Sequence, residues 1–219
     1  MISFEDVKNN RAVLTYISKA DETLKSLGYT EHSFAHVTKV AALSSEILST
    51  LGYSEREQEL AKIAGYLHDI GNIVNREEHS QSGAIMAFRI LDKMGMEAED
   101  IADVISAIGN HDEGVGVPVN AVAAAIILAD KSDVRRSRVR NNDPTTFDIH
   151  DRVNYSVINS ELSVEKEYGI IKLKLSVDLT YGSIMDYFEI FLNRMILCRK
   201  AAEKLGCSFK LDINGQQLI

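Results

Sequence analysis

Four histidines and two aspartates are the side chains of this sequence that could together hold metal ions. They are His36, His68, Asp69, His79, His111 and Asp130. Hydrolysis of a phosphate ester at neutral pH needs a strong nucleophile and compensation of the charge on the phosphoryl oxygens, and a divalent metal supplies both. Imidazole and carboxylate ligands suit iron, manganese, zinc or nickel better than calcium or magnesium, which prefer oxygen ligands. The residue types therefore favour one or more divalent transition metal ions.

The spacing of these residues requires separate helices to bring them together. Only His68 and Asp69 are adjacent, and neighbouring side chains on a regular helix point about 100° apart. Both can reach one metal only if the helix loosens in its last turn, shortly before Gly71. Ligands near the ends of different helices can converge on one pocket, as they do in helical bundles. A carboxylate can also bridge two metals through its two oxygens.

Apolar residues recur at helical spacing over the first two-thirds of the chain. They predict helices at residues 4–27, 34–51, 55–67, 80–94, 97–110 and 121–138. Ser54 with Glu57 has the form of a capping box, and Gly28 and Gly95 are typical helix stops. In this arrangement His36 lies near a helix start, His79 precedes a helix and His111 follows one.

The pattern changes after the turn-rich segment 141–144. Residues 171–179 alternate between apolar and polar, which indicates a half-buried strand, and residues 157–164 are a weaker candidate partner. A long helix is expected at 184–205, and Asn214-Gly215 is a hairpin turn signal after a last strand. We therefore expect a mainly α fold, with a helical metal-binding domain at 1–150 and a small α+β extension at 151–219.

Composition excludes several classes of protein. Hydrophobic residues make up 45% and charged residues 26% of the 219 residues, which is an ordinary globular balance. The formal net charge of −8 argues against broad binding to nucleic acid or to an anionic membrane. Cys198 and Cys207 cannot form a disulfide framework, so we interpret them as packed thiols. Without a long apolar run or a signal-peptide pattern, the expected location is cytoplasmic.

Three short segments of the chain resemble known motifs. They are His36-Val37-Thr38-Lys39-Val40, Ala64-Gly65-Tyr66-Leu67-His68-Asp69-Ile70-Gly71, and Leu128-Ala129-Asp130-Lys131. Together they resemble the H…HD…D signature of the HD-domain superfamily of metal-dependent phosphohydrolases, over roughly residues 30–140. The resemblance implies an HD-domain helical bundle and hydrolysis of a phosphoester by a metal-activated water.

The two remaining histidines match extra ligands in the two-metal branch of that superfamily. The resemblance implies one metal on His36, His68, Asp69 and Asp130, and a second on Asp69, His79 and His111. This branch includes the HD-GYP cyclic dinucleotide phosphodiesterases and a bacterial group that hydrolyses dinucleoside polyphosphates. The chain departs from the HD-GYP pattern, because Asn110 replaces the first histidine of a pair and the following loop lacks the tyrosine. The segment around Asp130 is closer to the second group.

Further residues are candidates for roles beside the metals. The basic cluster is Lys131, Arg135, Arg136, Arg138 and Arg140. It is either a phosphate clamp or a solvated helix end. Lys131 and Arg135 are the best candidates for neutralising substrate phosphate, with Asp69 orienting the nucleophile, whereas Arg136 and Arg138 are expected to face solvent or a partner. His32 is expected to be exposed and His150 to be structural.

Three functions remain open from the sequence. The leading hypothesis is a metal-dependent phosphohydrolase or phosphodiesterase with two metals per chain, acting on a small phosphorylated substrate such as a nucleotide. The second is a non-catalytic signalling or binding module with a structural metal. Here strand 171–179 would pair with a second chain in a homodimer. The third is a di-iron oxygenase on the same fold.

Overall fold

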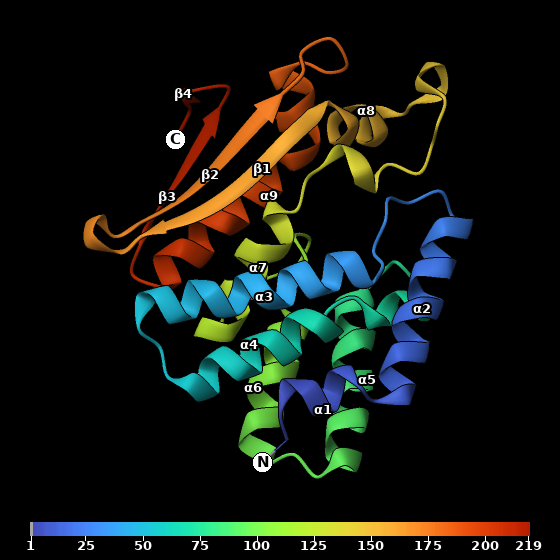
Figure 1. Ribbon diagram of the computed structural model, residues 1–219, viewed down its shortest axis with the longest axis vertical. Helices are drawn as coiled ribbons and strands as arrows, with labels where there is room; N and C mark the ends of the chain where they lie inside the picture. Colours follow the sequence, from blue (N-terminus) through green and yellow to red (C-terminus); the bar gives the residue numbers. More distant parts are fainter. Residues whose placement is uncertain (1) are drawn as a thin grey trace.

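The structure is a computed structural model that describes residues 2–219, and it consists of a helical body with a small sheet at its C-terminal end (Figure 1). The body contains α1 (Phe4–Lys8), α2 (Arg11–Ser26), α3 (Phe34–Leu51), α4 (Glu55–Leu67), α5 (His79–Met94), α6 (Ala98–Gly109) and α7 (Ala121–Ser132). The remainder contains α8 (Ile149–Ser156), β1 (Val157–Glu165), β2 (Ile170–Val177), α9 (Ile184–Lys204), β3 (Ser208–Ile213) and β4 (Gln216–Gln217). Four short 3₁₀ turns include η1 (Ile70–Ile73) and η2 (Arg136–Arg138). The mainly α fold is as expected; the boundary at residue 150 stays a prediction.

Local sequence signals explain where several elements begin and end. Ser54 and Glu57 form the expected capping box at the start of α4, and a second capping box opens α9. Asn214 and Gly215 both have positive φ, at 53° and 83°, as a two-residue hairpin turn between β3 and β4 requires. These boundaries follow from the conformational and hydrogen-bonding preferences of a few neighbouring residues.

Two of the expected helices are wrong in extent. The segment 4–27 is broken, because Asn10 accepts hydrogen bonds from the backbone of Ala12 and Val13 and so caps a new helix. The helix expected to reach residue 138 ends at Ser132, because Asp133 leaves helical conformation and its carboxylate is buried against other elements. His79 is the first residue of α5 rather than a residue before it.

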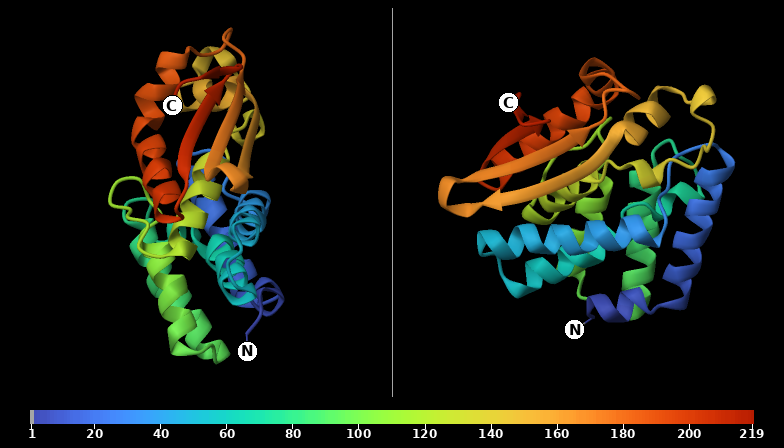
Figure 2. Two further views of the ribbon diagram at one scale, coloured as in Figure 1. Left: turned by 90° about the vertical axis from the view of Figure 1, so that its left-hand side faces the viewer. Right: turned by 45° about the horizontal axis from the view of Figure 1, so that its top comes forward.

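The sheet has the order β1-β2-β3-β4, with α9 as the crossover between β2 and β3. β1 and β2 are antiparallel, and β2 and β3 are parallel, so that Leu173 lies opposite Leu162 on one side and Leu211 on the other. The expectation that this strand pairs with a second chain is therefore wrong, because both edges of β2 are already hydrogen-bonded. The two side views show α9 alongside one face of the sheet (Figure 2).

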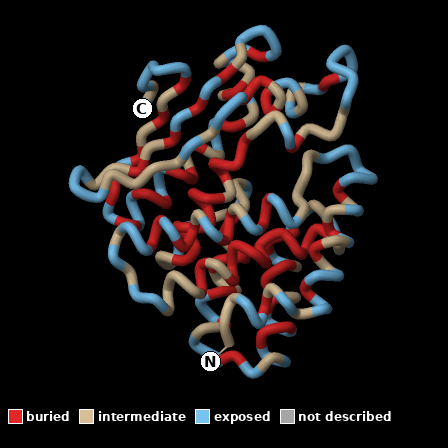
Figure 3. The backbone as a smooth tube through the Cα atoms, viewed as in Figure 1, coloured by how far each residue is buried: buried red, intermediate tan, exposed pale blue. Residues whose placement is uncertain are grey.

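Helix α7 lies at the centre of the molecule. All residues from Val122 to Ala129 are buried, and the helix packs against α3, α4, α6 and α9 (Figure 3). A helix that is apolar on all sides must be covered on all sides. The core is therefore continuous from the helical body to α9, and it includes the free thiols of Cys198 and Cys207, as expected. Among residues 2–219 no helix is long and apolar enough to cross a membrane.

Candidate metal centre

Four buried imidazole rings are oriented in the same manner. Each uses Nδ1 to bond an oxygen of the protein: His36 with Asp133 Oδ2 at 2.8 Å, His68 with Gly65 O at 2.8 Å, His79 with Arg76 O at 3.0 Å and His111 with Ile108 O at 2.6 Å. A carbonyl or carboxylate oxygen can only accept, so each ring carries its proton on Nδ1. Each Nε2 therefore points into the cluster, where a neutral ring could ligate a metal, and the Nε2 atoms of His79 and His111 lie 3.2 Å apart.

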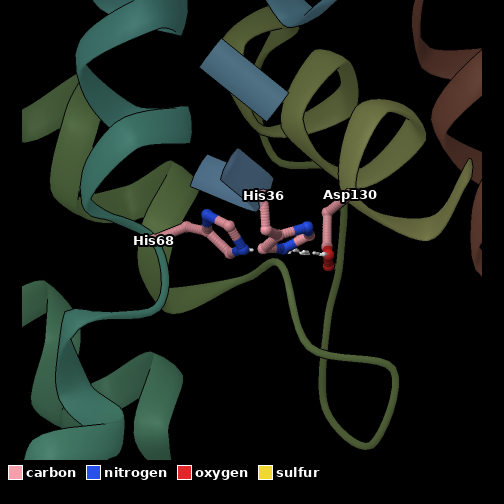
Figure 4. Close-up of side chains that lie close together, drawn as sticks. All are labelled: His36, His68 and Asp130. Carbon is pink, nitrogen blue, oxygen red and sulfur yellow. Dashed lines mark ion pairs between the residues drawn. The ribbon is translucent and has the colours of Figure 1, made fainter. Parts of the chain in front are cut away.

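Two carboxylates complete the cluster. Asp130 Oδ1 lies 3.3 Å from His36 Nε2 and 3.7 Å from His68 Nε2. These three side chains come from α3, the end of α4 and α7, and they point toward one another (Figure 4). One ligand atom from each lies within 4.8 Å of the other two, and the same holds for His68, Asp69 and His111.

The carboxylate of Asp69 lies between the two pairs of histidines. Its Oδ2 is 3.6 Å from His36 Nε2 and 3.2 Å from His68 Nε2. Its Oδ1 is 3.5 Å from His79 Nε2 and 4.0 Å from His111 Nε2. The two oxygens of one side chain therefore face different histidine pairs.

The buried atoms of this cluster fit a metal. His36 Nε2, His68 Nε2 and Asp69 Oδ2 are buried without a hydrogen-bond partner in the described part of the chain. Buried polar groups are almost always paired, because an unpaired one loses its interaction with water and gains nothing. Imidazole nitrogens with carboxylate oxygens are the ligands of divalent transition metals. The residues could therefore bind such an ion.

In the protein without metal, the charged groups of the cluster shift one another's pKa values. Burial would raise the pKa of Asp69, but the neighbouring His68 outweighs it and holds that pKa well below its usual range. Burial would likewise lower the pKa of His68, but Asp69 and Asp130 raise it to about 10. Burial, together with His68 and His79, keeps the pKa of His111 well below its usual value. The proton that His68 keeps between Asp69 and Asp130 shows that the two carboxylates stabilise a positive charge at this position.

The end of α4 brings His68 and Asp69 together as the sequence required. Helix α4 ends at Leu67, and Asp69 has left the helix with φ −99° and ψ 1°. Asn72 in η1 then donates from Nδ2 to Asp69 Oδ1 at 2.9 Å and fixes the carboxylate. Gly71 allows η1 to pass close to α5, because a Cβ there would lie 1.9 Å from the carbonyl oxygen of His79.

Lys131 and Arg135, the two side chains predicted to bind phosphate, lie in different surroundings. Lys131 is buried, and its Nζ lies 2.7 Å from Asp130 Oδ2 and 2.6 Å from Glu113 Oε2. Arg135 donates from Nε to Asp133 Oδ1 at 3.0 Å and from Nη2 to Glu31 Oε2 at 3.1 Å. It is not among the residues that line the cavity described next, whereas Lys131 is. The roles proposed for both stay predictions.

A cavity of about 460 Å³ opens onto the metal-ligand cluster. Its lining includes four of the six expected ligands, namely Asp69, His79, His111 and Asp130. It also includes side chains from the C-terminal part, among them His150, Asn154, Ile190, Phe191 and Arg194. The cavity therefore lies between the helical body and α8 and α9.

Two expectations about basic side chains, those for His32 and Arg138, are corrected by the structure. His32 is partly buried and lines the cavity, rather than being an exposed helix-start residue. His150, which is expected to be structural, is exposed and lines the same cavity, so its role stays a prediction. Arg138 was expected to face solvent or a partner, but it is buried, because Nε and Nη1 donate to the carbonyls of Glu31 and Asp133 at 2.8 and 2.7 Å.

Sequence reasoning missed the residues that hold the ligands in place. Asp133 follows Asp130 by three positions, just after α7 ends, and this spacing is the one signal that could have found it. Asn72 lies within a turn of Asp69, at a spacing that many surface asparagines share. Arg194 was missed because it lies 81 residues after Glu113 and meets it only in the folded chain, whereas Glu113 itself was a candidate for orienting ligands or water.

The fold and cluster define a helical protein with a His/Asp centre that could bind metal. A family model described as HD domain matches residues 33–135. Residues 33–135 of this chain are therefore an HD domain.

Individual relatives resemble only parts of this chain. An uncharacterized protein of Methanocaldococcus jannaschii is 26% identical over 159 residues, which cover 63% of this chain and 61% of that protein. Ribonuclease Y of Aliarcobacter butzleri is 31% identical, covering 51% of this chain and 20% of that protein. Ribonuclease Y of Lawsonia intracellularis is 34% identical, covering 47% of this chain and 18% of that protein. This chain thus spans less than two thirds of the length of each of these relatives.

A solved structure resembles part of the chain as well. The crystal structure of a predicted HD superfamily hydrolase from an uncultured Thermotogales bacterium has a TM-score of 0.46 and 25% sequence identity with it. The match covers 57% of this chain and 68% of that chain.

Proposed function

We propose that this protein is a metal-dependent phosphohydrolase that acts on a small phosphoester, such as a nucleotide. One observation carries the proposal: the two oxygens of Asp69 face different histidine pairs, and the ligand atoms around Asp69 Oδ2 are buried without partners. Such a cluster could hold two divalent ions beside a cavity. Membership of the HD domain family agrees with this assignment.

The residues divide between two positions. His36, His68 and Asp130 with Asp69 Oδ2 would hold one ion, and His79 and His111 with Asp69 Oδ1 would hold the other. Iron, manganese, zinc and nickel all accept this ligand set. When bound, a pair of divalent ions lowers the pKa of a water molecule and compensates the charge of phosphoryl oxygens.

The protein's own side chains would orient the reactants. Asp69, fixed by Asn72, is placed to accept a proton or to orient a water at the centre of the cluster. The Lys131 ammonium holds Asp130 and adds positive charge at the cavity wall. Burial of the four imidazoles excludes bulk water from the ligand atoms.

The volume of the cavity favours a small substrate. About 460 Å³ lies within the range of typical small-molecule sites, which is roughly 300–1,000 Å³. The two ribonuclease relatives raise RNA as a second candidate. Against RNA, the net charge of −8 gives no broad basic surface for a long phosphate backbone.

The decisive experiment measures metal content and then turnover. Protein purified without oxygen is analysed for metals, and phosphate or nucleotide release is followed from a panel of nucleotides, dinucleotides and a short RNA with each metal. We expect turnover of small phosphoesters and its loss, with loss of metal, in Asp69→Ala. Asp100→Ala is the matched control, because Asp100 is an aspartate paired with Arg56 away from the cavity.

Other outcomes identify the alternatives. Bound metal without hydrolysis of any substrate would indicate a non-catalytic module, and oxygen uptake with an organic substrate would indicate an oxygenase. Full phosphatase activity in metal-free Asp69→Ala would overturn the proposal. A homodimer and a cytoplasmic location stay predictions; light scattering on the purified protein tests the first.

A further inference from the structure

Helix α9 contributes an arginine to the cavity that holds the metal-ligand cluster. Arg194 and Phe191 line the same cavity as Asp69, His111 and Asp130. The helix follows the HD-domain segment by about fifty residues in sequence, yet it packs directly on α7, which carries Asp130. The wall that faces the cluster is thus built partly by the C-terminal part.

Two other cations of this cavity wall, Lys131 and Arg138, are already engaged. Lys131 Nζ lies between two carboxylates, Asp130 Oδ2 at 2.7 Å and Glu113 Oε2 at 2.6 Å. Arg138 donates from Nε and Nη1 to the carbonyls of Glu31 and Asp133. These bonds reduce the capacity of both side chains to bind a further anion.

Arg194 is held in place but has donors to spare. Its Nη2 donates to Glu113 Oε1 at 3.1 Å, and its guanidinium carbon lies 4.1 Å from the centre of the Phe191 ring. Its Nε is buried without a partner in the described part of the chain. A guanidinium group has five N–H donors in one plane, so a salt bridge at one nitrogen leaves an edge for two oxygens of another anion.

We propose that Arg194 binds a phosphoryl group of the substrate, so that the C-terminal part completes the phosphohydrolase site. The inference rests on the proposed function for its substrate class. A guanidinium edge binds two phosphate oxygens through parallel charge-assisted hydrogen bonds. Phe191 and Glu113 orient that edge before the substrate arrives, which lowers the entropic cost of binding.

A purely structural role for Arg194 makes a different prediction. Arg194, Glu113, Lys131 and Asp130 form an unbroken chain of ion pairs. If Arg194 served only to hold this series of ion pairs, removing Glu113 would have the same effect as removing Arg194. Both changes would then disturb metal binding at Asp130. If Arg194 binds phosphate, its removal weakens phosphate binding and leaves the metal in place.

The test is calorimetric titration of the metal-loaded protein with inorganic phosphate, together with metal analysis of each variant. Arg194→Gln should weaken phosphate binding by about tenfold or more while metal content and circular dichroism stay unchanged. Arg194→Lys should retain part of the affinity, because it keeps the charge and loses the planar fork. Arg199→Gln on the same helix is the matched control and should bind as the unmodified protein does, since Arg199 is exposed beside Glu203.

Each other outcome decides between the roles. Unchanged phosphate binding in Arg194→Gln overturns the proposal. Equal loss of phosphate and of metal in Arg194→Gln and Glu113→Gln also overturns it and shows a structural role. Phosphate binding can be measured without turnover. Loss of phosphate binding in Arg194→Gln, but not in Arg199→Gln, therefore supports the inference even if the protein hydrolyses no substrate. A lack of hydrolysis would reject the proposed function and not the role of Arg194.

Discussion

His36 donates its Nδ1 hydrogen to Asp133 Oδ2 at 2.8 Å, across 97 positions of the sequence. Asp133 is completely buried, and it also accepts from Lys39 at 2.7 Å and from Arg135 at 3.0 Å. The carboxylate therefore fixes which nitrogen of His36 is free and where it points. A histidine ligand oriented in this way is a better base toward a metal.

Asp133→Asn should weaken metal binding without removing a ligand. The amide keeps the size of the side chain but loses the charge that orients His36, so we expect affinity for a divalent metal to fall about 10- to 100-fold. Competition with a chromophoric chelator measures it. Asp100→Asn serves as the control for loss of a paired aspartate elsewhere, and equal affinities in both variants would show that Asp133 has no such role.

His111→Ala should separate the two proposed metal positions. His111 approaches Asp69 through Oδ1, whereas His36 and His68 approach it through Oδ2. If two ions bind, the variant should retain about half of the metal per chain and lose turnover. Elemental analysis of the purified variant decides, and an unchanged metal content would remove His111 from the ligand set.

Gly71→Ala should destabilise the fold around the cluster. Its Cβ would lie 1.9 Å from His79 O and 2.5 Å from Gly83 N, and both are backbone atoms that must shift. We expect a loss of at least about 3 kcal/mol in the free energy of unfolding. Gly109→Ala is the matched control, because the nearest atom to its Cβ is 3.7 Å away. A similar unfolding midpoint in urea for both variants would contradict the conclusion that the close approach of η1 to α5 requires glycine at position 71.

The metal-free protein should lose stability as the pH rises. Burial would lower the pKa of His68, but Asp69 and Asp130 raise it to about 10, above its ordinary value of 6.5. A raised pKa in the folded state stabilises the fold fully below pH 6.5, and this contribution disappears as the pH rises through 10. We expect the Tm of chelator-treated protein to fall between these values.

Added metal should reduce that fall, because a metal binds the neutral ring and replaces the proton. His68→Gln without metal should show a smaller dependence on pH over the same interval. An identical fall in Tm for this variant would show that His68 is not the group responsible.

Features that depend on neighbouring residues could be predicted from the sequence. The capping box at Ser54 is made by hydrogen bonds over three residues, and the turn at Asn214-Gly215 uses the positive φ that these two residue types tolerate, so their residues identify them. The ligand cluster could be proposed because imidazole and carboxylate have distinctive chemistry. His68 and Asp69 were expected to meet in a loosened helix end, and the structure confirms that geometry.

The surroundings of the cluster depend on distant contacts and could not be predicted. Lys131 next to Asp130 suggested a free cation for phosphate, but its ammonium is shared with Glu113, which the sequence places 18 positions earlier. Arg138 looked like a solvated charge, and it is buried because two backbone carbonyls happen to meet its guanidinium. Nothing in the local sequence around Arg194 indicates that it faces His111 and Asp130.

The burial of α7 on all sides has a consequence for handling the protein. A chain shortened to residue 150 would lack α9 and would present part of the most apolar helix to water. Exposed apolar surface of this kind drives self-association. We therefore expect the shortened chain to collect in inclusion bodies, and we expect a protease that nicks the loop before α9 to leave two fragments that stay together until denaturant separates them.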